Sequence, residues 1–191
     1  MNTDIAIVGM SCRFPDADSI GAYWENLKEG KQSIKKLSEE ELKLSGISDT
    51  LYNQENYVRA ASYISDIEHF DAGFFKYSPR EAAILDPQQR IMLELSHEAL
   101  ESAGYNSEYN TQNVGVFMGS GYNQYLLKNI LRGRSITDNS EEFFIQTSND
   151  KDYLASRISY KLNLHGPSVN IQTACSTSLV AVHFARKSLL A

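Results

Sequence analysis

The hydrophobic and polar positions near the end of the chain predict a short strand, a sharp turn and a long helix. Gly166-Pro167 starts this segment, and a run with β-branched residues follows it. From Cys175 to Ala191 there is no glycine or proline, and apolar residues recur at helical spacing. Because apolar residues extend almost all the way round this helix, we expect it to be buried on most sides. Cys175 is therefore expected where a buried strand meets the start of a buried helix.

The rest of the chain alternates between short apolar runs and stretches with helical spacing. Residues 5–10 and 113–120 are apolar runs of strand length, and we expect both to form strands, the first of them buried. Helical patterns cover residues 19–29, 87–103, 122–131 and 149–161. Because strands and helices interleave, the sequence predicts a layered α/β architecture.

Two helix starts follow each other closely in the middle of the chain. Ser78 precedes Pro79, and Glu81 completes a capping box with Ser78. Asp86 precedes a second proline in the same way. The sequence therefore predicts a short helix, a break and then a longer helix.

Composition and charge narrow the classes of function. The chain has 191 residues, of which 42% are hydrophobic and 22% charged, and this suits one domain with a substantial core. A net charge of −6, with the basic residues scattered, argues against nucleic acid or an acidic membrane as the main partner. No apolar stretch reaches transmembrane length and Asp4 interrupts the apolar start, so we expect neither a membrane span nor a signal peptide.

The sequence offers no motif for a bound cofactor or metal. Gly9 ends an apolar run, but no Gly-x-Gly-x-x-Gly pattern follows it. The two cysteines, Cys12 and Cys175, give neither a disulfide framework nor a zinc pattern. Free thiols suit a reducing compartment, so we expect a cytoplasmic protein.

Two interpretations of Cys175 compete. Free cysteines are among the most buried residue types and usually act as small hydrophobic side chains. At the start of a helix, however, free N–H groups and the positive end of the helix dipole favour a thiolate. Small neighbours leave room for a substrate, and backbone N–H groups are available to a developing oxyanion. Ser176, Thr177 and Ser178 suit the first helical turn, where we expect their hydroxyls to satisfy its free donors.

The other candidate groups have plainer interpretations. A structural role is favoured for His97 on a predicted helix, and a solvated one for His165 in a turn. His183 lies eight residues after Cys175. This is roughly 12 Å along a helix, too far for direct contact. Gly119-Ser120-Gly121 is a turn of small residues that can approach a ligand, although a plain turn is favoured.

Several motifs follow one another along nearly the whole chain. They are Ile5-Ala6-Ile7-Val8-Gly9-Met10-Ser11-Cys12-Arg13-Phe14-Pro15, Phe70-Asp71-Ala72-Gly73-Phe74-Phe75, Ser78-Pro79-Arg80-Glu81-Ala82, Asp86-Pro87-Gln88-Gln89-Arg90, Gly115-Val116-Phe117-Met118-Gly119, Arg157-Ile158-Ser159-Tyr160, Gly166-Pro167-Ser168 and Thr173-Ala174-Cys175-Ser176-Thr177-Ser178-Leu179-Val180-Ala181-Val182-His183. In this order they resemble the N-terminal half of a β-ketoacyl synthase, the ketosynthase domain of modular polyketide synthases. Gln172 and Thr177 stand where the commonest family form has Asp and Ser. These variants resemble trans-acyltransferase or hybrid polyketide/non-ribosomal peptide lines.

The resemblance implies a thiolase-like fold, a five-layered αβαβα sandwich of two related halves. It also implies that Cys175 is the catalytic nucleophile, which accepts an acyl group from the phosphopantetheine arm of an acyl carrier protein. Malonyl-carrier protein then loses carbon dioxide, and the resulting carbanion equivalent attacks the thioester in a decarboxylative Claisen condensation. An acyltransferase of this type extends polyketide chains, and the domain itself binds no cofactor.

The chain departs from the family pattern after the cysteine helix. Family members carry two histidines and a lysine in the C-terminal half, and none of the histidines here lies in those motifs. We therefore expect residues 1–191 to be the N-terminal portion of a ketosynthase domain, truncated after the cysteine helix and inactive alone in condensation. The expected partners are the C-terminal half of the ketosynthase, an acyl carrier protein and a second copy in a homodimer. The alternative is a non-catalytic ketosynthase remnant that docks carrier proteins or dimerises.

Overall fold

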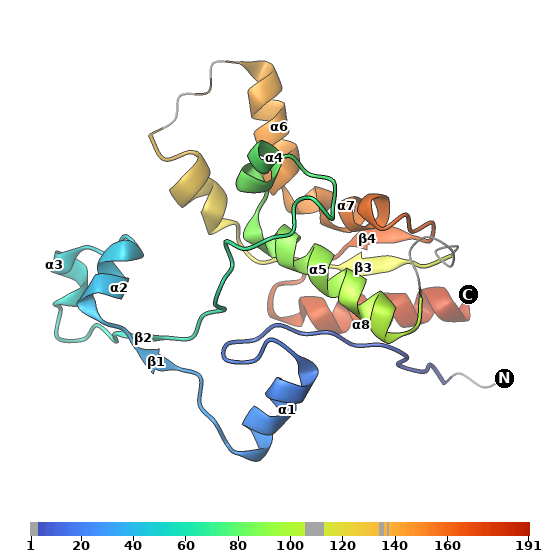
Figure 1. Ribbon diagram of the computed structural model, residues 1–191, viewed down its shortest axis with the longest axis horizontal. Helices are drawn as coiled ribbons and strands as arrows, with labels where there is room; N and C mark the ends of the chain where they lie inside the picture. The colour runs from blue at the N-terminus through green and yellow to red at the C-terminus, as the bar shows by residue number, and fades with distance from the viewer. Residues whose placement is uncertain (1–3, 106–112, 134–135, 137) are drawn as a thin grey trace. The chain divides into compact units, whose positions relative to one another are not determined.

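The computed structural model describes residues 4–105, 113–133, 136 and 138–191, which fall into two compact units (Figure 1). One unit is Cys12–Asp66, and the other combines Met1–Ser11 with Ile67–Ala191. In chain order the helices (α), 3-10 or π turns (η) and strands (β) are α1 Ile20–Lys28, β1 Lys35–Lys36, α2 Glu39–Leu44, α3 Asp49–Tyr52, β2 Ala60–Ala61, α4 Pro79–Ile84, α5 Pro87–Ser102, β3 Val116–Met118, η1 Leu126–Ile130, α6 Asn139–Asn149, η2 Lys151–Tyr153, α7 Leu154–Lys161, β4 Ser168–Asn170, η3 Ala174–Ser176 and α8 Thr177–Leu190.

The Cys12–Asp66 unit is built from three short helices and a two-stranded sheet among its described residues. β1 and β2 pair in antiparallel fashion, with Lys35 opposite Ala61. Ser38 accepts a hydrogen bond from the Glu41 N–H, and the Glu41 carboxylate accepts one from the Ser38 N–H, which completes a capping box at α2. Leu42 in the same helix is buried and anchors it.

The other unit is built on the parallel pair of β3 and β4, in which Phe117 lies opposite Val169. α7 and α8 both contact this pair and lie on opposite sides of it (Figure 1). Leu93 of α5 and Leu154 and Ile158 of α7 are fully buried in one hydrophobic cluster. The core therefore lies between the strands, α5 and α7.

The predicted break between a short and a long helix is confirmed. At the start of α4, Ser78 accepts from the Glu81 N–H, and the Glu81 carboxylate accepts from the Ser78 N–H. At the start of α5, Asp86 Oδ1 accepts from the Gln88 N–H at 2.9 Å. Gly104 follows α5 with a φ of +76°, a conformation that glycine adopts without strain.

Buried polar side chains join the start of α5 to the connection between α6 and α7. Gln89 is 1% exposed, and its Nε2 donates to the Asp150 carbonyl oxygen at 3.1 Å. Arg157 of α7 donates through Nε to Gln89 Oε1 at 2.6 Å and through Nη2 to the Thr147 carbonyl oxygen. Asn149 is also buried, and it donates to carbonyl oxygens of α4 and α6. The motif at the start of α5 is thus part of a buried polar junction.

Asp86 belongs to this junction and makes the stability of the chain depend on pH. Its burial raises the pKa of the carboxyl group, against the opposing effects of hydrogen bonds from Gln88 and the charge of Arg90. The folded state therefore holds the Asp86 proton more tightly than the unfolded state does. As pH rises from the ordinary pKa of 3.8 through the higher folded value, this group lowers the free energy of unfolding.

We expect an Asp86→Asn variant to lack this part of the pH dependence, because asparagine still caps a helix but does not titrate. The free energy of unfolding of the original chain minus that of the variant should fall as pH rises from 3.8, by at most about 1.4 kcal/mol per pH unit. The difference should then become constant above the folded pKa. Urea unfolding at stepped pH measures it, and a difference that rises with pH would contradict the prediction.

The prediction of a buried strand over residues 5–10 is wrong. Among the described residues this segment forms no strand, and Ile7 is 79% exposed. The segment instead lies against α5, where a Cβ atom on Gly9 would overlap the Ala99 carbonyl oxygen and Ser11 Oγ donates to the Leu95 carbonyl oxygen. An apolar run indicates burial, but a strand also needs a neighbouring strand, and neither β3 nor β4 pairs with residues 5–10.

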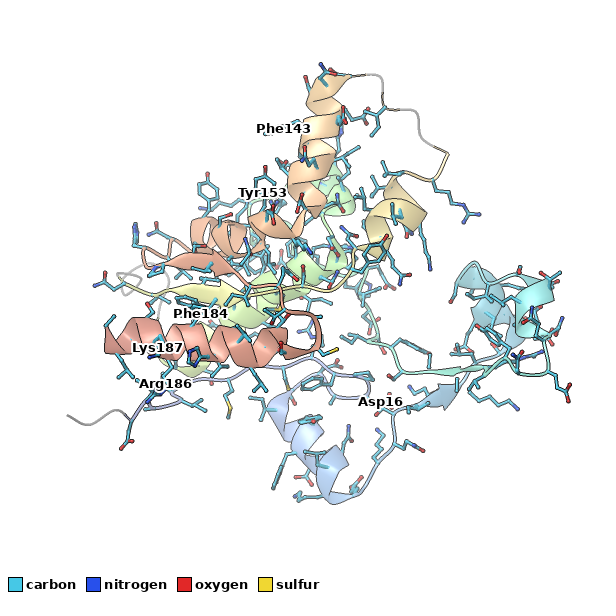
Figure 2. The ribbon with its side chains drawn as sticks, turned by 180° about the vertical axis from the view of Figure 1, so that it is seen from behind. Asp16, Phe143, Tyr153, Phe184, Arg186 and Lys187 are labelled. Atoms are coloured by element: carbon cyan, nitrogen blue, oxygen red, sulfur yellow. The ribbon has the colours of Figure 1, made fainter. Side chains whose placement is uncertain are left out.

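The predicted burial of the segments on both sides of Cys175 is also wrong. Val169 in β4 is 38% exposed. In α8 only Ala181 is buried. The exposed apolar side chains of α8 include Leu179 at 77% and Val182 at 66%, and Figure 2 shows Phe184 on the same helix. The reason is that β3 covers one side of α8, while no described segment of this unit covers the apolar remainder.

No helix in the described ranges is both long enough and apolar enough to span a membrane.

Candidate active site

Cys175 lies in η3, a single turn that leads directly into α8. The predicted strand-to-helix junction is confirmed, since β4 ends at Asn170 and α8 begins at Thr177. The thiol is exposed, which contradicts its interpretation as a buried structural side chain. Ala174, immediately before it, has a φ of +52°, in the left-handed region that residues other than glycine rarely adopt. The chain thus makes a strained turn to present an accessible thiol at the start of a helix.

The hydroxyl groups around Cys175 hydrogen-bond backwards along the chain. The Thr173 N–H donates to Thr177 Oγ1 at 3.0 Å, and Thr177 Oγ1 donates to the Ala174 carbonyl oxygen at 2.9 Å. Ser176 Oγ donates to the Thr173 carbonyl oxygen at 2.8 Å. Within this described segment neither η3 nor α8 begins with a side-chain cap, so the prediction that the hydroxyls satisfy the first helical turn is wrong. The hydroxyls instead hold the turn that contains the thiol. Among the described residues, the backbone N–H groups at the start of α8 donate to no side-chain cap.

The Gly119-Ser120-Gly121 turn after β3 packs against the cysteine segment. A Cβ atom on Gly119 would lie 2.5 Å from Thr177 Cγ2 and would overlap the Ile171 carbonyl oxygen. The side-chain amide of Gln172 faces the backbone of Ser120. In the orientation that satisfies both groups, its Oε1 accepts from the Ser120 N–H at 3.3 Å and its Nε2 donates to the Ser120 carbonyl oxygen at 3.2 Å. The absence of a side chain at Gly119 thus allows the backbone before Cys175 to pack directly against this turn.

The motif at the start of α5 supports this same turn. Gln88 Oε1 accepts a hydrogen bond from the Gly121 N–H at 2.8 Å. Gln88 Nε2 donates to Asp86 Oδ2 at 3.2 Å, which holds the amide in that orientation. The polar junction of α5 therefore reaches the turn that contacts the cysteine segment.

His97 and His165 have surroundings that agree with their predicted roles, whereas the structural role expected for His183 is not supported by its exposed side chain. His97 lies with Nδ1 3.6 Å from Glu101 Oε2 and its ring centroid 4.7 Å from that of Phe74, in keeping with a structural role. His165 and His183 are exposed. The His183 ring lies edge-on to Phe184, with the ring centroids 5.8 Å apart.

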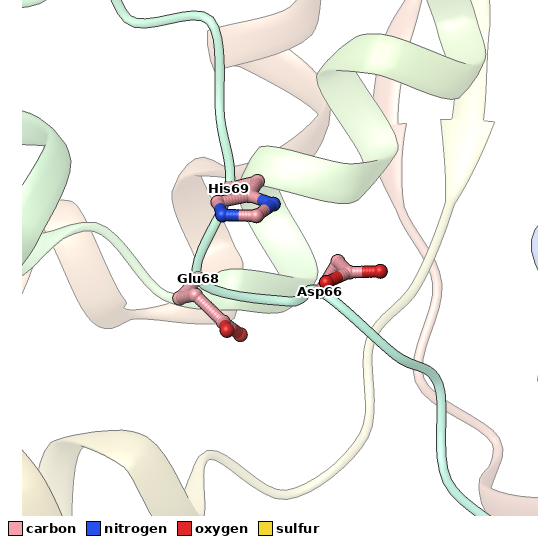
Figure 3. A group of neighbouring side chains, drawn as sticks. All are labelled: Asp66, Glu68 and His69. Atoms are coloured by element: carbon pink, nitrogen blue, oxygen red, sulfur yellow. The ribbon is translucent and has the colours of Figure 1, made fainter.

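Three side chains with metal-ligand chemistry lie close together at residues 66–69 (Figure 3). One ligand atom from each of Asp66, Glu68 and His69 lies within 4.8 Å of the others, and all three residues are exposed. Exposed acidic groups often lie together in this way without an ion, and the division between the two units falls inside this segment. We assign no metal site to it.

Sequence reasoning proposed Cys175 as the candidate nucleophile but missed the groups that contact its segment. Gly119 and Gln88 lie in motifs that are visible in the sequence, but nothing local indicates that they meet the cysteine segment. Thr177 stands out in the sequence as one of three hydroxyl residues in the first helical turn and as a departure from the commonest family form. Its two hydrogen bonds could be anticipated from the ability of threonine to bond to nearby backbone groups.

Comparison with known proteins identifies the family. Residues 2–191 match the family described as "Beta-ketoacyl synthase, N-terminal domain". The chain is 46% identical to a phenolphthiocerol/phthiocerol polyketide synthase of Mycobacterium tuberculosis, covering 97% of this chain and 13% of that protein. It is 38% identical to polyketide synthase PksN of Bacillus subtilis, covering 97% of this chain and 3% of that protein.

Solved structures give the same result. Ketosynthase twelve of the bacillaene polyketide synthase from Bacillus amyloliquefaciens superposes with a TM-score of 0.82 at 36% identity, covering 96% of this chain and 32% of that one. The chain thus spans 13% of the length of the first of these relatives and about a third of that solved ketosynthase. The fold is the N-terminal portion of a thiolase-like fold, and the chain belongs to the β-ketoacyl synthase family, among the ketosynthases of polyketide synthases.

Proposed function

We propose that this chain is the nucleophile-bearing portion of a polyketide ketosynthase, with Cys175 as its acyl acceptor. The observation that carries the proposal is the exposed thiol in a strained turn at the start of α8. Strained backbone at an accessible nucleophile is a common feature of active sites. The free N–H groups of a helix start suit both a thiolate and a developing oxyanion.

The proposed reaction has two steps. The Cys175 thiolate attacks the carbonyl carbon of an acyl thioester on the phosphopantetheine arm of a carrier protein, and the pantetheine thiolate leaves. A malonyl thioester then loses carbon dioxide, and its enolate forms a carbon–carbon bond with the acyl carbon. The Cys175 thiolate is the leaving group of this second step and is regenerated. The product is a β-ketoacyl thioester on the carrier protein.

The second step requires groups outside residues 1–191. By the resemblance, the histidines and lysine that promote decarboxylation lie in the C-terminal half, and that half is the first partner we propose. Leu179 and Val182 support this, because a complete sandwich would need to cover the exposed apolar face of α8. A carrier protein, a second copy in a homodimer and a cytoplasmic location complete the proposal. The trans-acyltransferase or hybrid subtype stays a prediction from Gln172 and Thr177.

Acyl transfer to Cys175 is directly testable by intact mass. The chain, alone and assembled with a C-terminal ketosynthase portion, is incubated with an acyl-pantetheine thioester. We expect a mass increase of one acyl group, because an exposed thiol at a helix start is a competent nucleophile. Cys175→Ala should abolish the increase, while Cys12→Ala, which removes the other of the two cysteines, should leave it unchanged.

An equal acyl mass on Cys175→Ala and on the original chain would overturn the proposal. A second candidate function is that of a non-catalytic docking or dimerisation module, favoured by the exposed apolar face of α8. An original chain that stays unacylated even when complemented, yet forms a dimer or binds carrier protein, would favour this second function.

A further inference from the structure

Thr177 is the first residue of α8, and its hydroxyl bonds to the backbone of the two residues before Cys175. Its hydroxyl is both acceptor and donor: it accepts from the Thr173 N–H at 3.0 Å and donates to the Ala174 carbonyl oxygen at 2.9 Å. A hydroxyl can fill both roles at once. These two bonds join the residue after the turn to the two residues before Cys175.

The turn that these bonds enclose needs support. Ala174 has a φ of +52°, and a Cβ atom makes this left-handed conformation unfavourable for alanine. Such a conformation persists only where the surrounding structure determines it. The Thr177 hydroxyl bonds the carbonyl oxygen of Ala174 itself, so it acts on the strained residue directly.

The methyl group of Thr177 anchors the same side chain from the other side. A Cβ atom placed on Gly119 would lie 2.5 Å from Thr177 Cγ2, so the methyl packs against a glycine with no space to spare. Thr177 is half-buried, whereas Cys175 and Ser176 are exposed. The methyl contact fixes the rotamer that directs the hydroxyl to the turn, since β-branched side chains have few χ1 choices.

We propose that Thr177 is a positioning residue for the Cys175 thiol, its hydroxyl holding the left-handed turn at Ala174 and its methyl group seated against Gly119. The part of this inference that concerns acyl transfer rests on the proposed function. The part that concerns the turn does not. The two parts therefore need separate measurements.

The turn is tested by hydrogen exchange of the Thr173 amide in Thr177→Val and Thr177→Ser variants. Valine keeps the shape of threonine but removes the hydroxyl, and serine keeps the hydroxyl but removes the methyl. We expect Thr177→Val to raise the exchange rate of this amide by about tenfold, as the loss of one net hydrogen bond does. Thr177→Ser, which loses only the methyl contact with Gly119, should raise the exchange rate by less than Thr177→Val does.

The positioning is tested by the rate of Cys175 acylation in the same two variants assembled with a C-terminal ketosynthase portion. Thr177→Val should acylate about tenfold more slowly, and Thr177→Ser should restore most of the rate. Alkylation by iodoacetamide needs an accessible thiolate but no oriented acyl thioester, so it should change little in either variant and shows that Cys175 is still accessible and reactive.

The outcomes of these measurements separate the two proposals. Thr177→Val that exchanges and acylates like the original chain would overturn the role of the hydroxyl, and Thr177→Ser that is indistinguishable from the original chain would overturn the role of the methyl group. If the original chain is not acylated at all, the proposed function fails. The exchange rates then decide alone whether Thr177 holds the turn.

Discussion

Replacing Gly119 with alanine is expected to lower Cys175 acylation by about a hundredfold, the size of effect that a displacement of about 1 Å has on a reacting group. The new Cβ atom would overlap the Ile171 carbonyl oxygen and lie 2.5 Å from Thr177 Cγ2. One of these contacts is backbone, which cannot rotate away, so the segment before Cys175 must move. The same overlap should lower the free energy of unfolding by about 1–3 kcal/mol. Acyl mass against time and urea unfolding measure the two effects.

Gly121 provides a matched control two residues away in the same turn. A Cβ atom there would lie 3.2 Å from Gln88 Oε1 and would meet no backbone atom, so the Gln88 amide needs to give by only a few tenths of an ångström and can keep its bonds to Asp86 and Gly121. We expect Gly121→Ala to change the free energy of unfolding by no more than about 0.5 kcal/mol and to acylate at nearly the original rate. Equal acylation rates for Gly119→Ala and Gly121→Ala would show that contact with the cysteine segment does not matter.

Helix starts were the part of the fold that the sequence predicted best. Ser78 and Asp86 cap α4 and α5 as expected, because a capping side chain acts within three residues and its partners are visible in the sequence. The helix after Cys175 and the turn before it were predicted from other local features: Gly166-Pro167, apolar residues at helical spacing, and the absence of glycine and proline after Cys175. Cys175 itself could be singled out because the residues that form a strand-to-helix junction follow one another in the sequence.

Burial was predicted least well, since it depends on what covers a surface. Residues 5–10 are apolar enough for a buried strand, yet Ile7 is 79% exposed because no strand pairs with the segment in the described unit. α8 is apolar nearly all round, but one side alone is packed. An apolar stretch of sequence thus indicates that its surface is suited to burial, but it does not indicate which segment covers that surface.

The supporting groups of the candidate site escaped prediction because their contacts are distant in sequence. Gly119 was visible as part of a small-residue turn, but its partners Ile171 and Thr177 lie far along the chain. Gln88 was visible within the start of α5, and nothing local predicts its bond to Gly121. Rules for short segments are enough to propose Cys175 as a nucleophile. The residues that contact its segment can be found only from the tertiary structure.

Arg157→Ala is expected to lower the free energy of unfolding by about 2–4 kcal/mol, the largest stability loss among these variants. The guanidinium donates at 2.6 Å to Oε1 of Gln89, which is 1% exposed, and it also donates to the Thr147 carbonyl oxygen. Alanine at position 157 would leave both acceptors without these donors, and an unpaired buried acceptor costs about 1–3 kcal/mol. Arg80→Ala, which removes an exposed arginine, should cost no more than about 0.5 kcal/mol.

A double-mutant cycle isolates the bond between Arg157 and Gln89. If the two side chains stabilise the junction together, Gln89→Ala should cost less in the Arg157→Ala background than alone, by about 0.5–3 kcal/mol. Additive losses would contradict the coupling. Gln88 links the same stretch of α5 to Gly121. Arg157→Ala should therefore also slow Cys175 acylation, because loosening the start of α5 loosens the turn that contacts the cysteine segment. Arg80→Ala should acylate at the original rate.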